Sequence, residues 1–227
     1  MNAFKEYDNC PINMGEKIHA VVFSAIVILS FSFIGIRIDD FDSEKFTDIN
    51  KIPHFSSEND TAGWSLKLGG FGTDIVSEIA TSESSGNIAI SGMFTQTLFY
   101  GDEGGIPATG TENDEDFFIA MITADGEWDW VIGGGSSSGS DDIQSLAFDS
   151  FGNLLVIGSF CIGTAGLSCQ LELEGLSPIM KGADEDGGYG FVAKLSNSGT
   201  WIWVEKFGTN TDDLGMDIVV DSSNNAI

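Results

Sequence analysis

The chain has 227 residues, 42% of them hydrophobic, with 29 glycines and only 4 prolines, a composition more typical of strands and turns than of helices. Its 35 acidic residues against 9 basic ones give a formal net charge of −26. Such a surface repels nucleic acid and anionic lipid headgroups, which excludes a nucleic-acid partner and favours cations or basic partners. The alternative is that the charge only serves solubility, for example in a salty environment.

The N-terminal part predicts a membrane segment. The stretch AVVFSAIVILSFSFIGI, from Ala20 to Ile36, carries no charge. Together with its flanks, residues 18–38, it predicts an uncleaved signal-anchor helix or a cleaved signal peptide, with a buried core helix as the third alternative. Lys5 and Lys17 precede the apolar stretch, and four acidic residues follow it: Asp39, Asp40, Asp42 and Glu44. This charge asymmetry predicts that residues 1–17 lie in the cytoplasm and the rest of the chain outside it. Residues 39–62 are acidic and aperiodic and are predicted to form a linker.

From Trp64 onward the sequence repeats itself. GNIAISGMF at Gly86–Phe94 returns as GNLLVIGSF at Gly152–Phe160. DFFIAMITADGEWDWV, which begins at Asp116, returns as YGFVAKLSNSGTWIWV, which begins at Tyr189. Phrases that recur in the same order indicate an array of similar supersecondary units. We divide the region 63–227 into repeats at about 64–130, 131–203 and 204–227.

Each repeat is predicted to hold four antiparallel strands. In the second repeat the alternating apolar residues place them at 143–149, 153–160, 191–195 and 200–207. Gly and Asn in the intervening turns can adopt the positive φ that tight hairpins need. The predicted strands carry apolar residues on both faces, as expected for a sheet that packs against another sheet on each side. We therefore predict an all-β fold of β-propeller blades, two complete and one or two partial, after an N-terminal hydrophobic helix.

Several phrases carry a resemblance to a known repeat. GG-x-G-x-D, D-S-x-G-N-x-x-x-x-G and G-x-W-x-W resemble the SBBP repeat of bacterial and archaeal seven-bladed propellers, and also the NHL-type rhythm. The resemblance covers about Trp64 to Ile227 and implies a propeller fold while saying almost nothing about activity. The sequence departs from the pattern in its long loops between second and third strands, and at Tyr189, where the first repeat has Asp116. DSSNNAI, the last seven residues, matches TSESSGNIAI of the first repeat and DSFGNLLV of the second, and so begins a third copy of this strand. We therefore expect the chain to be the front of a longer product.

Acid-rich loops are the candidate binding face. Propeller geometry brings the loops from fourth strand to first, and from second to third, to one side, where most acidic phrases fall. There NDED and ADEDGG supply carboxylates beside glycines, and Ca²⁺ prefers such oxygen ligands. The alternative is that these acids cap turns and keep the loops solvated. The candidate calcium ligands are Asp114, Asp116, Asp184 and Asp186.

Cysteines and tryptophans give two structural predictions. Cys161 and Cys169 are predicted to form a disulfide in an oxidising compartment, or else to be small unpaired hydrophobes. Tryptophans two apart in a strand face the same way, and we predict that they pack blade on blade, with a carbohydrate platform as the alternative. The residues concerned are Trp64, Trp128, Trp130, Trp201 and Trp203.

No catalytic residue can be named. The only histidines, His19 and His54, precede the repeats, and the sequence has no P-loop or C-x-x-C motif. We therefore predict a non-catalytic recognition or adhesion protein of the cell envelope, membrane-anchored or secreted, with a protein or glycan ligand on the acidic loop face. The alternatives are a calcium-stabilised structural repeat of a large surface protein, and the front of a propeller enzyme (lyase, glycosidase or quinoprotein) whose catalytic residues lie in further blades.

Overall fold

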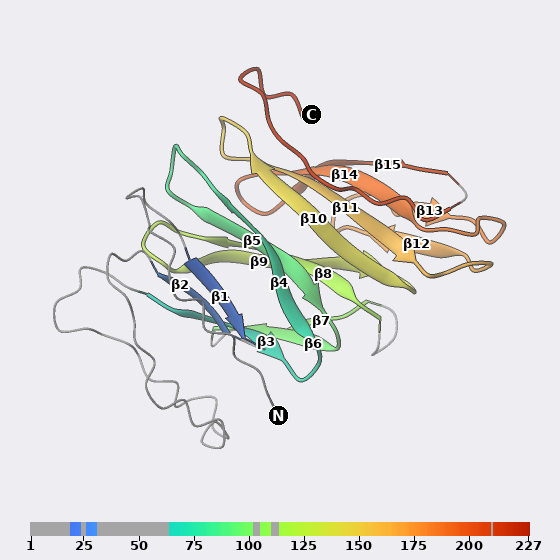
Figure 1. Ribbon diagram of the computed structural model, residues 1–227, viewed down its shortest axis with the longest axis horizontal. Coiled ribbons are helices and arrows are strands. Elements are labelled where there is room, and N and C mark those ends of the chain that lie inside the picture. The colour runs from blue at the N-terminus through green and yellow to red at the C-terminus, as the bar shows by residue number, and fades with distance from the viewer. Residues whose placement is uncertain (1–18, 24–25, 31–63, 102–104, 110–113, 210) are drawn as a thin grey trace, which may run out of the picture.

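Figure 1 shows the computed structural model of the chain, which describes residues 19–23, 26–30, 64–101, 105–109, 114–209 and 211–227. The regular elements of these residues are all β-strands, joined in antiparallel sheets, which confirms the all-β prediction. The described part of the chain contains no helix with the length and apolarity that a bilayer crossing requires.

The predicted tail, 1–17, and the predicted linker, 39–62, lie outside the described residues. Of the predicted membrane segment, 18–38, the structure describes only β1 (His19–Phe23) and β2 (Ile26–Ser30). The signal-anchor or signal peptide therefore stays a prediction.

Two four-stranded antiparallel meanders form the centre of the molecule. In each, the strands are neighbours in chain order, and tight turns join the first strand to the second and the third to the fourth. The first meander contains β4 (Asp74–Thr81), β5 (Ile88–Phe94), β8 (Asp116–Ile122) and β9 (Trp128–Ser136). The second contains β10 (Ser140–Phe148), β11 (Leu154–Ile162), β14 (Tyr189–Leu195) and β15 (Trp201–Phe207).

A short hairpin is inserted between the second and third strand of each meander. The first hairpin is β6 (Thr97–Tyr100) and β7 (Gly105–Pro107), and the second is β12 (Cys169–Glu172) and β13 (Ile179–Lys181). Each hairpin leaves its own meander and pairs with the strand that precedes that meander. Thus β6 pairs with β3 (Leu66–Gly70), and β12 pairs with β9. The pairing of β12 with β9 therefore links the two meanders through backbone hydrogen bonding as well as through side chains.

Two apolar layers hold the sheets together. Neighbouring residues on β8 point to opposite faces, so Phe117 enters the layer between the two meanders while Phe118 enters the layer beneath β3 and β6. Every residue of β8 is buried, which explains why its sequence DFFIAMI is almost continuously apolar. β10 lies against β4, β5 and β8, so the second meander stacks on the first. Blade-like units stacked face to face fit this arrangement, although the described residues form no closed ring.

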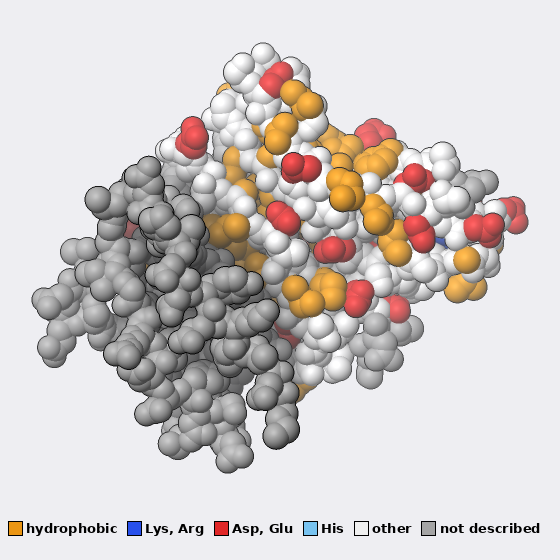
Figure 2. All heavy atoms as spheres, in the orientation of Figure 1, with side chains coloured by type: hydrophobic (Ala, Val, Ile, Leu, Met, Phe, Trp, Pro, Cys, Tyr) orange, Lys and Arg blue, Asp and Glu red, His pale blue; other side chains and the backbone are white. Residues whose placement is uncertain are grey.

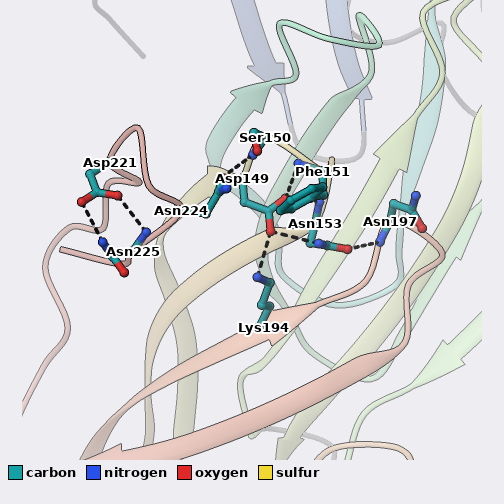
Figure 3. Close-up of polar contacts among 9 residues, drawn as sticks. All are labelled: Asp149, Ser150, Phe151, Asn153, Lys194, Asn197, Asp221, Asn224 and Asn225. Carbon is teal, nitrogen blue, oxygen red and sulfur yellow. Dashed lines mark hydrogen bonds and ion pairs between the residues drawn. The ribbon is translucent and has the colours of Figure 1, made fainter.

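The last residues repeat the turn of the second meander. In Figure 3, Asp149 Oδ1 accepts hydrogen bonds from the backbone N–H groups of Phe151 and Asn153, and its Oδ2 accepts one from the Asn153 side chain. Asp221 makes the corresponding three bonds at the next copy, with Ser223 and Asn225 as donors. The two turns also touch, because the Ser150 N–H donates to Asn224 Oδ1 at 2.8 Å.

Candidate functional site

A groove of about 390 Å³ lies where the two inserted hairpins approach β9. This volume falls at the lower end of the range of small-molecule pockets. One wall comes from the end of the β6–β7 hairpin and the other from the β12–β13 hairpin, while β9 forms the floor. The lining residues are Ile106, Pro107 and Thr109, then Gly133 and Gly134, then Glu172, Leu173, Glu174, Leu176 and Pro178. We call this space the hairpin groove.

Glycines in the floor allow the two walls to come close. A Cβ at Gly133 would lie 2.6 Å from Ile106 Cγ2. At Gly134 it would lie 2.5 Å from Phe117 Cζ and 3.1 Å from Leu173 Cδ2. Real Cβ atoms do not approach so closely, so the run of glycines at the end of β9 is explained by packing on both faces of the strand.

The edge of β9 is open along the groove. One side of β9 pairs with β8 from Trp128 to Gly134. On the other side β12 pairs only with Gly135 and Ser136, and no other strand among the described residues pairs there. Alternate residues of an antiparallel strand direct their N–H and C=O groups to each side, so this edge carries backbone donors and acceptors without a strand partner.

The wall formed by the second hairpin is acidic. Glu172 and Glu174 are both exposed and flank the buried Leu173. Glu172 accepts a hydrogen bond from the side-chain amide of Gln170, and Glu174 has no hydrogen bond within the described residues. Among the residues that line the groove, none is basic. On the face of the molecule drawn in Figure 2, Asp and Glu side chains are scattered over the described residues and Lys and Arg are nearly absent.

Asp116, a predicted calcium ligand, lies behind the first wall. It begins β8 and is 1% exposed. Its Oδ2 accepts a hydrogen bond from the backbone N–H of Thr109, which lines the groove, and its Oδ1 has no partner among the described residues. Burial raises the pKa of this carboxyl to about 7. Asp116 therefore positions the end of the first hairpin. Asp114, nearby in sequence, is half-buried.

The other two predicted ligands, Asp184 and Asp186, are exposed in the loop before β14. This loop is fixed by a lysine: the Lys181 ammonium is fully buried and donates to the backbone oxygens of Thr164, Leu167 and Glu185 at 2.9, 2.8 and 2.7 Å. Across the described ranges, no three His, Cys, Asp or Glu side chains form a group that could hold a metal ion. The calcium site stays a prediction, and the structure does not unite its four proposed ligands.

Two further devices fix the second hairpin. Cys161 and Cys169 are joined by a disulfide, with their Cα atoms 6.1 Å apart, and both are buried. Asp141 accepts hydrogen bonds from Ser136 N (2.6 Å), Ser136 Oγ (2.7 Å) and Cys161 N (2.9 Å), and thus ties the end of β9 to the end of β11. Burial raises the pKa of Asp141 to about 7, although these donors oppose the shift. The role of Asp141 as a buried acceptor was not predicted from the sequence, where it is one of many loop acids.

The tryptophans lie away from the groove, and Trp130 and Trp201 join the two meanders. Trp64 covers Gly126, and Trp130 covers Gly199 in the last turn of the second meander. The Trp130 indole also donates to the backbone oxygen of Asn197 at 3.0 Å. The remaining three occupy different settings: Trp201 is buried against Phe117, Trp128 lies beside Tyr100, and Trp203 is half-buried.

No family model matches the chain, and no curated protein matches its sequence. The resemblance to SBBP and NHL-type repeats therefore has no support from these comparisons.

Proposed function

We propose that the chain is a non-catalytic recognition protein that binds its ligand in the hairpin groove. One observation carries the proposal: hairpins from two consecutive repeats meet over Gly133 and Gly134, and buried contacts fix both of them. The Thr109–Asp116 hydrogen bond fixes one wall, and the disulfide with Lys181 fixes the other. A groove with walls that are already ordered binds without the entropy cost of ordering them.

We further propose that the two meanders are blades of a β-propeller held outside the cytoplasm. The stacking of the second meander on the first supports the blade assignment, since propeller blades pack face to face. The apolar stretch from Ala20 to Ile36 and the Cys161–Cys169 disulfide support the location, since disulfides persist in oxidising compartments. Recognition at loops on one side of such a scaffold is a common use of repeat architectures.

The test is to probe the full chain on arrays of peptides and of glycans, beside two single variants. Pro178→Trp places an indole in the hairpin groove, at an exposed loop position. Leu167→Trp places the same side chain at an exposed site outside the groove and is the matched control. We expect ligands that bind the unmodified chain and Leu167→Trp and are lost with Pro178→Trp. If no ligand shows this dependence, the groove is not a recognition site and the proposal is wrong.

A further inference from the structure

We infer that the hairpin groove binds an extended peptide segment bearing lysine or arginine, which adds to the open edge of β9 as a further strand. This inference rests on the proposed function, because it names the ligand of the same groove. Its three supports are an interrupted strand ladder, a glycine floor and an acidic wall.

The groove occupies the place where the β12 ladder stops. β12 pairs with β9 through Leu171↔Ser136 and Glu172↔Gly135. A tight turn then carries the chain away, closed by the Leu176 N–H on the Leu173 oxygen at 3.0 Å. Had β12 continued straight, its next residues would have lain beside Gly134 and Gly133. The space that a continued strand would fill is therefore the hairpin groove.

The floor suits the approach of another backbone. Because Gly133 and Gly134 lack side chains, Ile106 and Leu173 can pack close above and below β9, which leaves its backbone edge as the floor between the two walls. Glycine in a strand commonly marks a site where another backbone comes close. Addition of an extended peptide to an exposed edge gives affinity through main-chain hydrogen bonds, while pockets for alternate side chains give specificity. The fold already uses this mode, since β6 adds to β3 and β12 adds to β9.

The walls specify alternating basic and apolar side chains. Glu172 and Glu174, exposed on either side of Leu173, offer carboxylates two residues apart, the spacing of side chains on one face of an extended peptide. Ile106 and Leu176 offer apolar contacts from opposite walls. The formal net charge of −26 attracts a basic segment and repels an acidic one.

The experiment measures fluorescence anisotropy of a labelled (Lys-Val)4 peptide with the full chain at about 150 mM salt, where exposed charges are screened beyond roughly 8 Å. Two peptides serve as controls: (Glu-Val)4, and (Lys-Val)4 with every backbone amide N-methylated, which keeps the charges and removes the main-chain donors of both edges. We expect the N-methylated peptide to bind about tenfold more weakly or worse, as loss of main-chain hydrogen bonds predicts. Equal binding of the two lysine peptides would mean adsorption to an acidic surface and would overturn the inference.

Paired variants locate the site. Glu172→Gln with Glu174→Gln removes the two groove carboxylates, and Asp125→Asn with Glu127→Gln makes the same charge change on the exposed β8–β9 turn. We expect about a tenfold loss for the first pair and less than about twofold for the second, since only close charges contribute strongly at this salt. Equal losses would overturn the inference.

The array experiment separates failure of this inference from failure of the proposed function. If the ligands that depend on the groove are neutral glycans, the inference is wrong and the proposed function stands. If no ligand is sensitive to Pro178→Trp, both are wrong.

Discussion

Replacement of Lys181 with methionine tests how the groove wall is held. Lys181 is 0% exposed, and its ammonium donates to three backbone oxygens at 2.7–2.9 Å, two in the disulfide loop and one in the loop before β14. Methionine keeps most of the aliphatic stem and removes the charge. The variant therefore leaves three carbonyl oxygens, those of Thr164, Leu167 and Glu185, without their donor.

The expected loss follows from two opposing effects. A hydrogen bond to a charged group contributes about 1.5–3 kcal/mol, and a buried group left without its partner costs about 1–3 kcal/mol. Burial of the ammonium itself is unfavourable by several kcal/mol, and methionine relieves that cost. Some of the freed carbonyls can also reach water, because the two loops they belong to lie at the surface. We expect a net loss of about 3 kcal/mol in the free energy of unfolding, which is about 6–12 °C in Tm for a chain of this size.

Urea unfolding of the full chain, followed by tryptophan fluorescence, measures the loss. Lys206→Met is the matched control, because Lys206 is exposed, donates to a single backbone oxygen, that of Met180 at 2.8 Å, and lies 4.1 Å from the ring centroid of Tyr189. Its replacement should cost about 1 kcal/mol or less. If Lys181→Met costs no more than Lys206→Met, the buried ammonium does not hold the two loops together and the reasoning fails.

Three further outcomes are expected. Burial raises the pKa of Asp116 from 3.8 to about 7, so the folded state keeps a proton that the unfolded state releases. The free energy of unfolding should fall as pH rises from about 4 to about 7, and Asp116→Asn should flatten that part of a urea-unfolding series; an unchanged profile would contradict it. Reduction of the Cys161–Cys169 disulfide, with a sequence separation of 8, should lower the free energy of unfolding by about 2–3 kcal/mol, and equal urea midpoints with and without reductant would refute this. Asp149→Ala removes the acceptor of the turn and the partner of Lys194 at 2.8 Å, and should cost about 2 kcal/mol in the same assay; a loss below about 0.5 kcal/mol would count against the turn network.

Strands of the second meander could be predicted because their signals are local. The expected strands at 143–149 and 153–160 correspond to β10 and β11, and those at 191–195 and 200–207 correspond to β14 and β15. Alternation of apolar residues fixes which side chains enter the core, and the glycine of each turn fixes where a strand ends. Gly152, at φ +79°, is such a position, and Asn224 takes its place at φ +63° in the next copy.

Both inserted hairpins were missed because their signals are not local. The residues of β12 and β13 were expected to form a long loop, since strands of four and three residues are too short to show a period of two. What makes β12 a strand is its partner β9, more than thirty residues earlier in the chain. Lys181 was equally invisible, because a lysine beside an acidic loop ordinarily lies in water, and only the folded chain brings three carbonyl oxygens around it.

Three lysines of the second meander and its hairpin are held by internal contacts, and this affects what the groove can bind. Lys181 is committed to three backbone oxygens, Lys194 to Asp149, and Lys206 to the oxygen of Met180. These cations are held by internal contacts, so none of them neutralises Glu172 or Glu174 in the groove wall. The contacts that order the wall therefore also leave its carboxylates available. A basic peptide that enters meets a fixed strand edge beside two carboxylates that no lysine or arginine of the described residues is paired with.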